Sequence, residues 1–204
     1  MEKAKGESGM ELAFDKILTS SCEGERIDYG ILFGNEKIVF IKSGAAGKIK
    51  GYGEKYLKMA HRVRKRMGAT VICASNPDVS HSSIDEKTIR SVVSMQKLTH
   101  FELYFVGTSD GAYQNFELAE IFKETVKMLS INSSYIELEE LKNKILAFGN
   151  VDKIFVCGTK DEDYKRLKTL KEMENEKFHY VEIAGADHKF VGMLDEFIAL
   201  IDLI

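Results

Sequence analysis

One short segment constrains the fold of this chain more than any other, and it reads FVGTSDGA over residues 105–112. The apolar, aromatic-rich run at residues 101–106 is typical of a buried strand, and residues 114–122 carry apolar side chains at helical spacing. A strand, a tight Gly-x-Ser-x-Gly turn and a helix in this order force Ser109 into a strained backbone conformation and expose its hydroxyl. Ser109 is therefore a candidate nucleophile. The alternative is a structural turn with a capping serine.

Composition places the chain among globular proteins. It has 204 residues, 44% hydrophobic and 30% charged, which suits one domain with a sizeable core, predicted over residues 10–204 after a flexible leader at residues 1–9. The formal net charge of -3 and the lack of a basic patch argue against nucleic-acid binding. No run approaches the roughly 20 apolar residues of a membrane span, and the polar start does not resemble a signal peptide. We predict no membrane association.

Cysteine usage and ligand spacing indicate the compartment and the chemistry. Cys22, Cys73 and Cys157 are few and odd in number, which is typical of free thiols in a reducing cytoplasm. No CxxC or His-x-x-x-His spacing suggests a metal, so we expect neither a metal nor a cofactor. The predicted localisation is cytoplasmic.

Hydrophobic periodicity predicts an α/β fold. Two strands are expected first, at residues 12–20 and 26–33, with a polar turn between them. Further strands are expected at residues 37–41, 69–74, 101–106, 125–131, 153–157 and 178–183, and helices at residues 52–67, 83–97 (opened by a Ser-x-x-Glu capping box), 114–122, 138–148, 164–176 and 191–204. The strict alternation implies a mostly parallel central sheet of about eight strands with helices on both faces.

Small or polar loops follow four of the apolar strands. They contain residues 43–47, Ser109, Asp161 and His188. Ligands of open parallel sheets bind beyond the carboxyl ends of the strands, where these four loops are expected to meet. The sequence therefore predicts a functional site formed by them.

Three short motifs carry a resemblance to a known family: GTSDG at residues 107–111, GTKD at residues 158–161 and GADH at residues 185–188. Their chain order, serine then aspartate then histidine, and their positions after successive strands are similar to those of the α/β-hydrolase superfamily. The resemblance covers residues 12–204. It implies the α/β-hydrolase fold, with GTSDG as the nucleophile elbow.

The resemblance implies a catalytic triad. Ser109 would attack a carbonyl carbon, His188 would take and later return the proton, and Asp161 would orient the imidazole. Asp163 is the alternative acid, but the Gly-x-x-Asp spacing favours Asp161. The other histidines fall in ordinary positions and are predicted to be structural: His61, His81, His100 and His179.

The resemblance also implies an oxyanion hole formed by two backbone N–H groups. One would come from Asp110, and the second from Ala45, with Ala46 as the alternative donor. An ionised carboxylate aimed at the oxyanion would oppose catalysis, so the Asp110 side chain is expected to point away. The predicted lining of the adjacent cavity comprises Ser43, Gly44 and Tyr52.

Two features depart from many members of the family. Where these have His-Gly at the oxyanion loop, this chain has Ser43-Gly44 preceded by Lys42. Lys42 is expected to be a surface lysine at the end of a strand, and the alternative is that it attracts an anionic substrate. Many relatives carry a lid after the sixth strand, whereas here only residues 132–137 separate that strand from the next helix. We therefore expect a minimal fold without a cap domain.

The predicted function is that of a serine hydrolase. It would cleave a carboxylic ester, thioester or related acyl bond of a small-molecule acyl substrate through an acyl-enzyme. A small serine peptidase or an acyltransferase on the same fold is one alternative. A non-catalytic binding protein that retains the fold is the other, because fold alone does not determine function.

Overall fold

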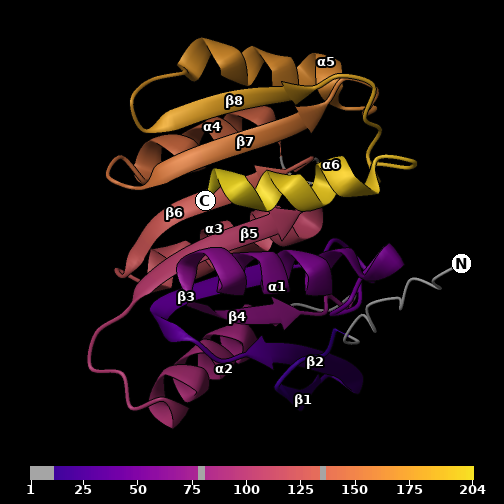
Figure 1. The fold of residues 1–204 in the computed structure, drawn as a ribbon. Coiled ribbons are helices and arrows are strands. Elements are labelled where there is room, and N and C mark those ends of the chain that lie inside the picture. The colour runs from indigo at the N-terminus through magenta and orange to yellow at the C-terminus, as the bar shows by residue number, and fades with distance from the viewer. Residues whose placement is uncertain (1–11, 78–80, 134–136) are drawn as a thin grey trace, which may run out of the picture.

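An eight-stranded sheet organises the molecule, in the order β1-β2-β4-β3-β5-β6-β7-β8 (Figure 1). The computed structural model describes residues 12–77, 81–133 and 137–204, so the leader predicted at residues 1–9 lies outside the described residues. The strands are β1 (Lys16–Cys22), β2 (Glu25–Leu32), β3 (Asn35–Lys42), β4 (Ala69–Ala74), β5 (Glu102–Thr108), β6 (Thr125–Ile131), β7 (Asp152–Gly158) and β8 (Phe178–Ile183). β2 pairs antiparallel with β1 and β4, and the pairs from β4 through β8 are parallel. The predicted mostly parallel sheet is confirmed.

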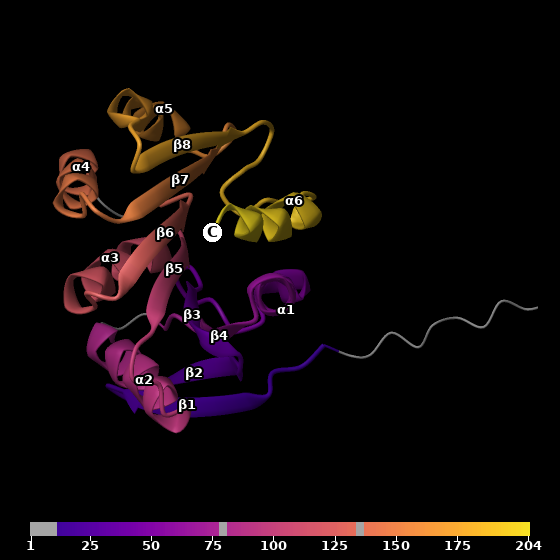
Figure 2. The same ribbon diagram turned by 60° about the vertical axis from the view of Figure 1, so that its left-hand side comes forward.

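Helices cover both faces of the sheet (Figure 2). One face carries α1 (Lys55–Met67) and α6 (Leu194–Ala199), and the other carries α2 (Ser82–Met95), α3 (Asp110–Ile121), α4 (Leu138–Ala147) and α5 (Tyr164–Leu167). Short 3-10 helices extend three of the segments: η1 (Tyr52–Glu54), η2 (Lys168–Met173) and η3 (Leu200–Leu203).

The sheet separates two hydrophobic cores. Successive side chains of a strand point to opposite faces, so in β3 Phe40 packs toward α2 and α3 while Val39 and Ile41 pack toward α1 and α6. Phe40 meets Phe105 of β5 edge to face, with ring centroids 6.0 Å apart. Burial on both faces explains why the central strands are continuous apolar runs rather than alternating ones.

Several boundaries differ from those predicted. β1 begins at Lys16 rather than at residue 12, and the helices expected at residues 164–176 and 191–204 are each a short α-helix followed by a 3-10 turn. The capping-box prediction is wrong: α2 begins at Ser82 after His81, and no side-chain cap bond is formed. The His81 side chain is instead buried in a polar cluster described below.

No cap domain interrupts the order of elements after β6. Residues 132–137 alone connect β6 to α4, although 134–136 lie outside the described residues. In the part of the chain that the structure describes, no helix is long and apolar enough to cross a membrane.

Candidate active site

Ser109 occupies a strained turn between β5 and α3. Its backbone has φ 54° and ψ -125°, a conformation that L-residues adopt only where the surroundings impose it. Close packing explains the glycines on either side. A Cβ on Gly107 would lie 2.3 Å from Ala112 Cα, and one on Gly111 would lie 2.2 Å from the Ser43 carbonyl oxygen. The turn therefore fixes the serine at the carboxyl edge of the sheet.

Ser109, His188 and Asp161 form a continuous chain of hydrogen bonds, although they lie up to 79 positions apart in sequence. Ser109 Oγ lies 3.0 Å from His188 Nε2, and His188 Nδ1 lies 2.7 Å from Asp161 Oδ2. The Asp161 side chain is fully buried, whereas the His188 side chain is 28% exposed. The structure thus brings together the three side chains that the sequence singled out, with the imidazole open to one side.

The carboxylate that contacts His188 belongs to Asp161 and not to Asp163. The second carboxylate oxygen of Asp161 accepts a hydrogen bond of 2.8 Å from the Asp163 backbone N–H. The Asp163 carboxylate accepts instead from Arg166 Nε at 3.3 Å. Asp163 therefore closes the turn that holds Asp161 but does not contact the imidazole.

Asn132, at the end of β6, ties together the loops that carry the acid and the histidine. It is fully buried with φ 46°, and its Oδ1 accepts from the Gly158 N–H at 2.9 Å. Its Nδ2 donates to the carbonyls of Asp187 and His188, at 3.2 and 3.1 Å. One amide side chain thereby fixes the spacing between β7 and the loop that follows β8.

The loop after β3 lies directly against the serine. A Cβ on Gly44 would lie 3.3 Å from Ser109 Cβ, and Ala45 and Ala46 line the same cavity as the serine. Ser43, the other residue predicted for the lining, is buried, and its Oγ donates to the Ala74 carbonyl at 3.1 Å. Gly44 and Tyr52 are among the residues that line the cavity.

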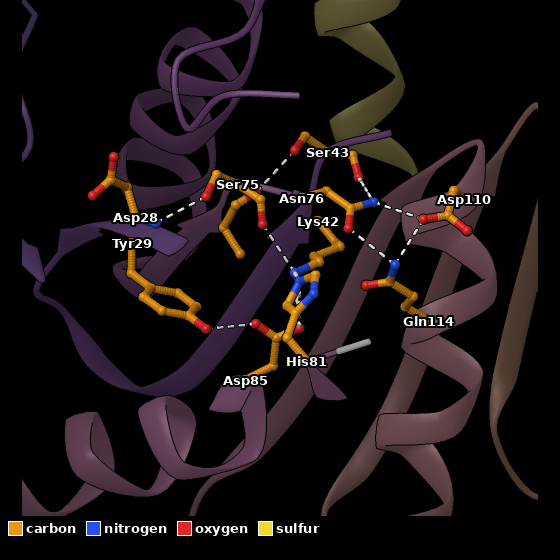
Figure 3. Close-up of polar contacts among 11 residues, drawn as sticks. Asp28, Tyr29, Lys42, Ser43, Ser75, Asn76, His81, Asp85, Asp110 and Gln114 are labelled. Atoms are coloured by element: carbon orange, nitrogen blue, oxygen red, sulfur yellow. Dashed lines mark hydrogen bonds and ion pairs between the residues drawn. The ribbon is translucent and has the colours of Figure 1, made fainter. Parts of the chain in front are cut away.

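The Asp110 carboxylate is held by two amide side chains, as Figure 3 shows. Its Oδ2 accepts from Asn76 Nδ2 at 2.9 Å and from Gln114 Nε2 at 2.6 Å. Asn76 also donates to the Ser43 carbonyl at 3.0 Å, so the same amide links the elbow to the loop after β3. The carboxylate therefore has two side-chain donors of its own.

Lys42, the last residue of β3, is fully buried beneath the loop after β3, so the prediction of a surface lysine is wrong. Its ammonium has three N–H donors, and three acceptors surround it: the Ser75 carbonyl at 2.9 Å, Asp85 Oδ2 at 2.8 Å and His81 Nε2 (Figure 3). Tyr29 Oη donates to the other Asp85 oxygen at 2.7 Å. Burial lowers the pKa of Lys42, and the adjacent Asp85 opposes that shift.

A cavity of about 960 Å³ opens above Ser109 and His188. Its wall combines the loop after β3, the start of α1 and the loop that follows His188. Two of its large apolar side chains are mostly exposed, Tyr52 at 86% and Val191 at 73%. Its lining also includes four lysines: Lys48, Lys50, Lys55 and Lys189. The described residues contain no group of three or more His, Cys, Asp or Glu side chains that could hold a metal ion.

Comparison with solved structures identifies the fold. Est1E from Butyrivibrio proteoclasticus superposes with a TM-score of 0.68 at 13% identity, over 92% of this chain and 96% of that one. An α/β serine hydrolase homologue from Coxiella burnetii gives 0.66 at 14% identity, over 94% and 98%. A lid-less α/β serine hydrolase from Xanthomonas campestris gives 0.58 at 16% identity, over 92% of each chain. This chain has the α/β-hydrolase fold. No protein-family model matches it, and no curated protein matches it by sequence.

Within the α/β-hydrolase fold, the residues that sequence reasoning missed are those that support the site. Asn132 and Asn76 hold the loops in place, and neither belongs to a recognisable motif. Asn132 directly follows β6, and Asn76 lies two residues after the end of β4. Their position at the carboxyl ends of strands is the one sequence signal that could have identified them. Three of the lysines of the cavity wall lie within residues 48–55, and the folded chain brings Lys189 to them from far along the sequence.

Proposed function

We propose that this protein is a serine hydrolase that cleaves a carboxylic ester, thioester or related acyl bond of a small substrate. The observation that carries the proposal is the hydrogen-bonded chain of Ser109, His188 and Asp161, which opens into the cavity. Ser109 Oγ attacks the carbonyl carbon while His188 Nε2 takes its proton, and the leaving group then receives that proton. Water, activated by the same imidazole, hydrolyses the resulting acyl-enzyme. Asp161 accepts from His188 Nδ1–H and keeps the imidazole in the required tautomer.

In this proposal, the tetrahedral oxyanion is stabilised by the backbone N–H groups of Asp110 and Ala45. Asp110 begins α3, and the positive end of the helix dipole favours negative charge there. Gly44, adjacent to Ala45, packs against Ser109, which brings the second donor loop within reach of the reacting carbon. The hydrogen bonds from Asn76 and Gln114 hold the Asp110 carboxylate so that it does not oppose the developing charge.

Two similar structures support the reaction class. Those from Coxiella burnetii and Xanthomonas campestris are both described as α/β serine hydrolases or their homologues. A small serine peptidase, an acyltransferase or a non-catalytic binding protein would have the same fold. The strained serine in hydrogen-bond contact with a partly exposed histidine favours an enzyme over a binding protein.

Covalent labelling with a fluorophosphonate probe tests the proposal. We expect stoichiometric labelling of the wild type, with the adduct on Ser109 by mass spectrometry, and no labelling of Ser109→Ala. His188→Ala should also abolish labelling, while His179→Ala, an exposed histidine of β8, should not alter it. Persistent labelling of Ser109→Ala would show that the nucleophile is wrongly assigned.

The absence of a cap between β6 and α4 bears on the size of the substrate. With six residues in that connection, we propose that the cavity mouth stays open and that short or compact acyl groups are preferred. Each extra methylene gains roughly 0.8 kcal/mol only where a wall buries it. In a series of 4-nitrophenyl esters, kcat/KM should fall beyond about four to six carbons. A maximum at palmitate would contradict this.

A further inference from the structure

The charged side chains of the cavity wall are nearly all of one sign. The charged residues that line it are Lys48, Lys50, Lys55 and Lys189, and no carboxylate is among the lining side chains of the described residues. The chain as a whole has a formal net charge of -3, so positive charge is concentrated at the cavity of a protein that is negative overall. A low-dielectric cleft lined by one sign of charge attracts ligands of the opposite sign.

Lys55 is the most deeply placed of these lysines. Its Nζ lies 4.0 Å from the centroid of the Phe197 ring and 5.0 Å from that of Tyr56, so two aromatic faces shield it from water. Within the described residues, no carboxylate lies within ion-pair distance of it. Burial lowers the pKa of Lys55 to about 8. A partly desolvated ammonium without an acidic partner gains more from an incoming anion than a fully hydrated one does.

The nearby carboxylates are already engaged. Glu54 pairs with Lys50 at 3.0 Å. Asp187 accepts from the backbone N–H groups of Lys189 and Val191, each at 3.0 Å. Among the described residues, Lys48, Lys55 and Lys189 have no carboxylate partner, and of these three only Lys55 is partly buried.

We propose that the substrate carries a negatively charged group, a carboxylate or a phosphate, which Lys55 binds at the cavity wall while Ser109 attacks the acyl carbon. The inference rests on the proposed hydrolase function and adds the class of substrate to it. Lys48, Lys50 and Lys189 at the rim attract the anion, and Lys55 receives it. The exposed rings and methyls of Tyr52 and Val191 offer an apolar contact for the part of the substrate between the anion and the reacting bond.

Three chromogenic esters test the proposal and distinguish where the anion lies. 4-Nitrophenyl butyrate is neutral, mono-4-nitrophenyl glutarate carries a carboxylate on the acyl side, and 5-butyryloxy-2-nitrobenzoate carries one on the leaving group. We expect kcat/KM of the wild type to be about tenfold higher for one anionic ester than for the neutral one, since a hydrogen bond to a charged group is worth about 1.5–3 kcal/mol. The preferred ester shows which side of the substrate bears the charge.

Three variants assign the preference to Lys55. Lys55→Gln should lower the ratio of anionic to neutral kcat/KM by about tenfold, and Lys55→Arg should retain most of it. Lys123→Gln removes an exposed lysine at the opposite end of the sheet, just before β6, and should leave the ratio unchanged. If Lys123→Gln changes the ratio as much as Lys55→Gln does, the effect is that of net charge and the assignment is wrong.

A binding measurement separates failure of this inference from failure of the proposed function. 4-Nitroglutaranilic acid and 4-nitrobutyranilide are amide analogues of two of the esters, and calorimetry with Ser109→Ala measures their Kd without turnover. Tighter binding of the acidic anilide, lost in Ser109→Ala/Lys55→Gln, supports the anion site even if no ester is hydrolysed. Hydrolysis of the neutral ester without preference for either anionic ester overturns the inference and leaves the hydrolase intact. Equal binding of the two anilides, with no anionic ester preferred, overturns it as well.

Discussion

Two groups of aspartate and histidine lie at the same edge of the sheet, and their surroundings make them different. Asp161 and His188 meet Ser109 at the cavity, where the histidine side chain is 28% exposed. Asp85 and His81 meet Lys42 beneath the loop after β3, where all three side chains are fully buried. The first group has an open side that a substrate can reach, and the second has none.

The comparison shows that residue types alone do not define an active site. In the buried group, each donor of Lys42 has an acceptor, and Tyr29 satisfies the second oxygen of Asp85. The buried group holds the end of β3, and with it the start of the loop after β3, against the segment that carries Asn76. In the open group, the Ser109 hydroxyl has one hydrogen-bond partner among the described side chains, His188 Nε2.

The sharpest test of this difference removes each histidine in turn. His188→Gln should lower kcat by roughly four to six orders of magnitude, because members of a triad act as a unit. His81→Gln should lower the free energy of unfolding, while kcat per folded molecule changes less than about tenfold. Steady-state kinetics and urea unfolding measure the two effects. A comparable loss of kcat in both variants would break the distinction.

The two aspartates of the loop after β7 provide the next test. Asp161→Asn should lower kcat by about 10⁴-fold, because the amide would stabilise the wrong imidazole tautomer. Asp163→Asn keeps the backbone N–H that bonds to Asp161 Oδ1 and changes a carboxylate that pairs with Arg166, so kcat should stay within about tenfold of the wild type. A larger loss in the Asp163 variant would show that the acid is wrongly assigned.

Substitutions in the buried group should lower the free energy of unfolding more than they lower kcat. Lys42→Met leaves the Asp85 carboxylate buried without its cation and should lower the free energy of unfolding by about 3–5 kcal/mol. Lys42→Met/Asp85→Asn removes the stranded charge as well and should recover part of that loss. Urea titrations of the two variants measure the difference. Equal destabilisation would mean that packing, and not charge, accounts for the role of Lys42.

The smallest expected effect concerns Lys55 at the cavity wall. Since the pKa of Lys55 is lowered to about 8 by burial, its ammonium form is lost as pH rises through that value. KM for an anionic ester should therefore rise by about tenfold between pH 7 and 9, relative to KM for the neutral ester. Tyr56, which faces the same ammonium, stays neutral because burial raises its pKa, and the other groups at the rim are exposed lysines. A constant ratio of the two KM values would contradict the role of Lys55.

The sequence by itself determined the fold class and the order of the site residues. The alternation of apolar strands and amphipathic helices predicts a parallel sheet with two covered faces, because both patterns follow from local geometry. GTSDG, GTKD and GADH each follow a strand, and parallel strands bring their carboxyl ends to one edge. Ser109, Asp161 and His188 could therefore be placed together without coordinates.

The tertiary structure alone decided the environment of each charged group. Lys42 ends β3 and Lys55 begins α1. Nothing in their local sequence shows that the first ammonium is buried among three acceptors and that the second is partly buried over two aromatic rings. Asn132 and Asn76 bind backbone groups of loops that are distant from them in sequence. The helices expected at residues 164–176 and 191–204 end as the 3-10 helices η2 and η3 in the folded chain. Burial and pairing depend on which segments meet across the fold, and that information is not carried by any one stretch of the chain.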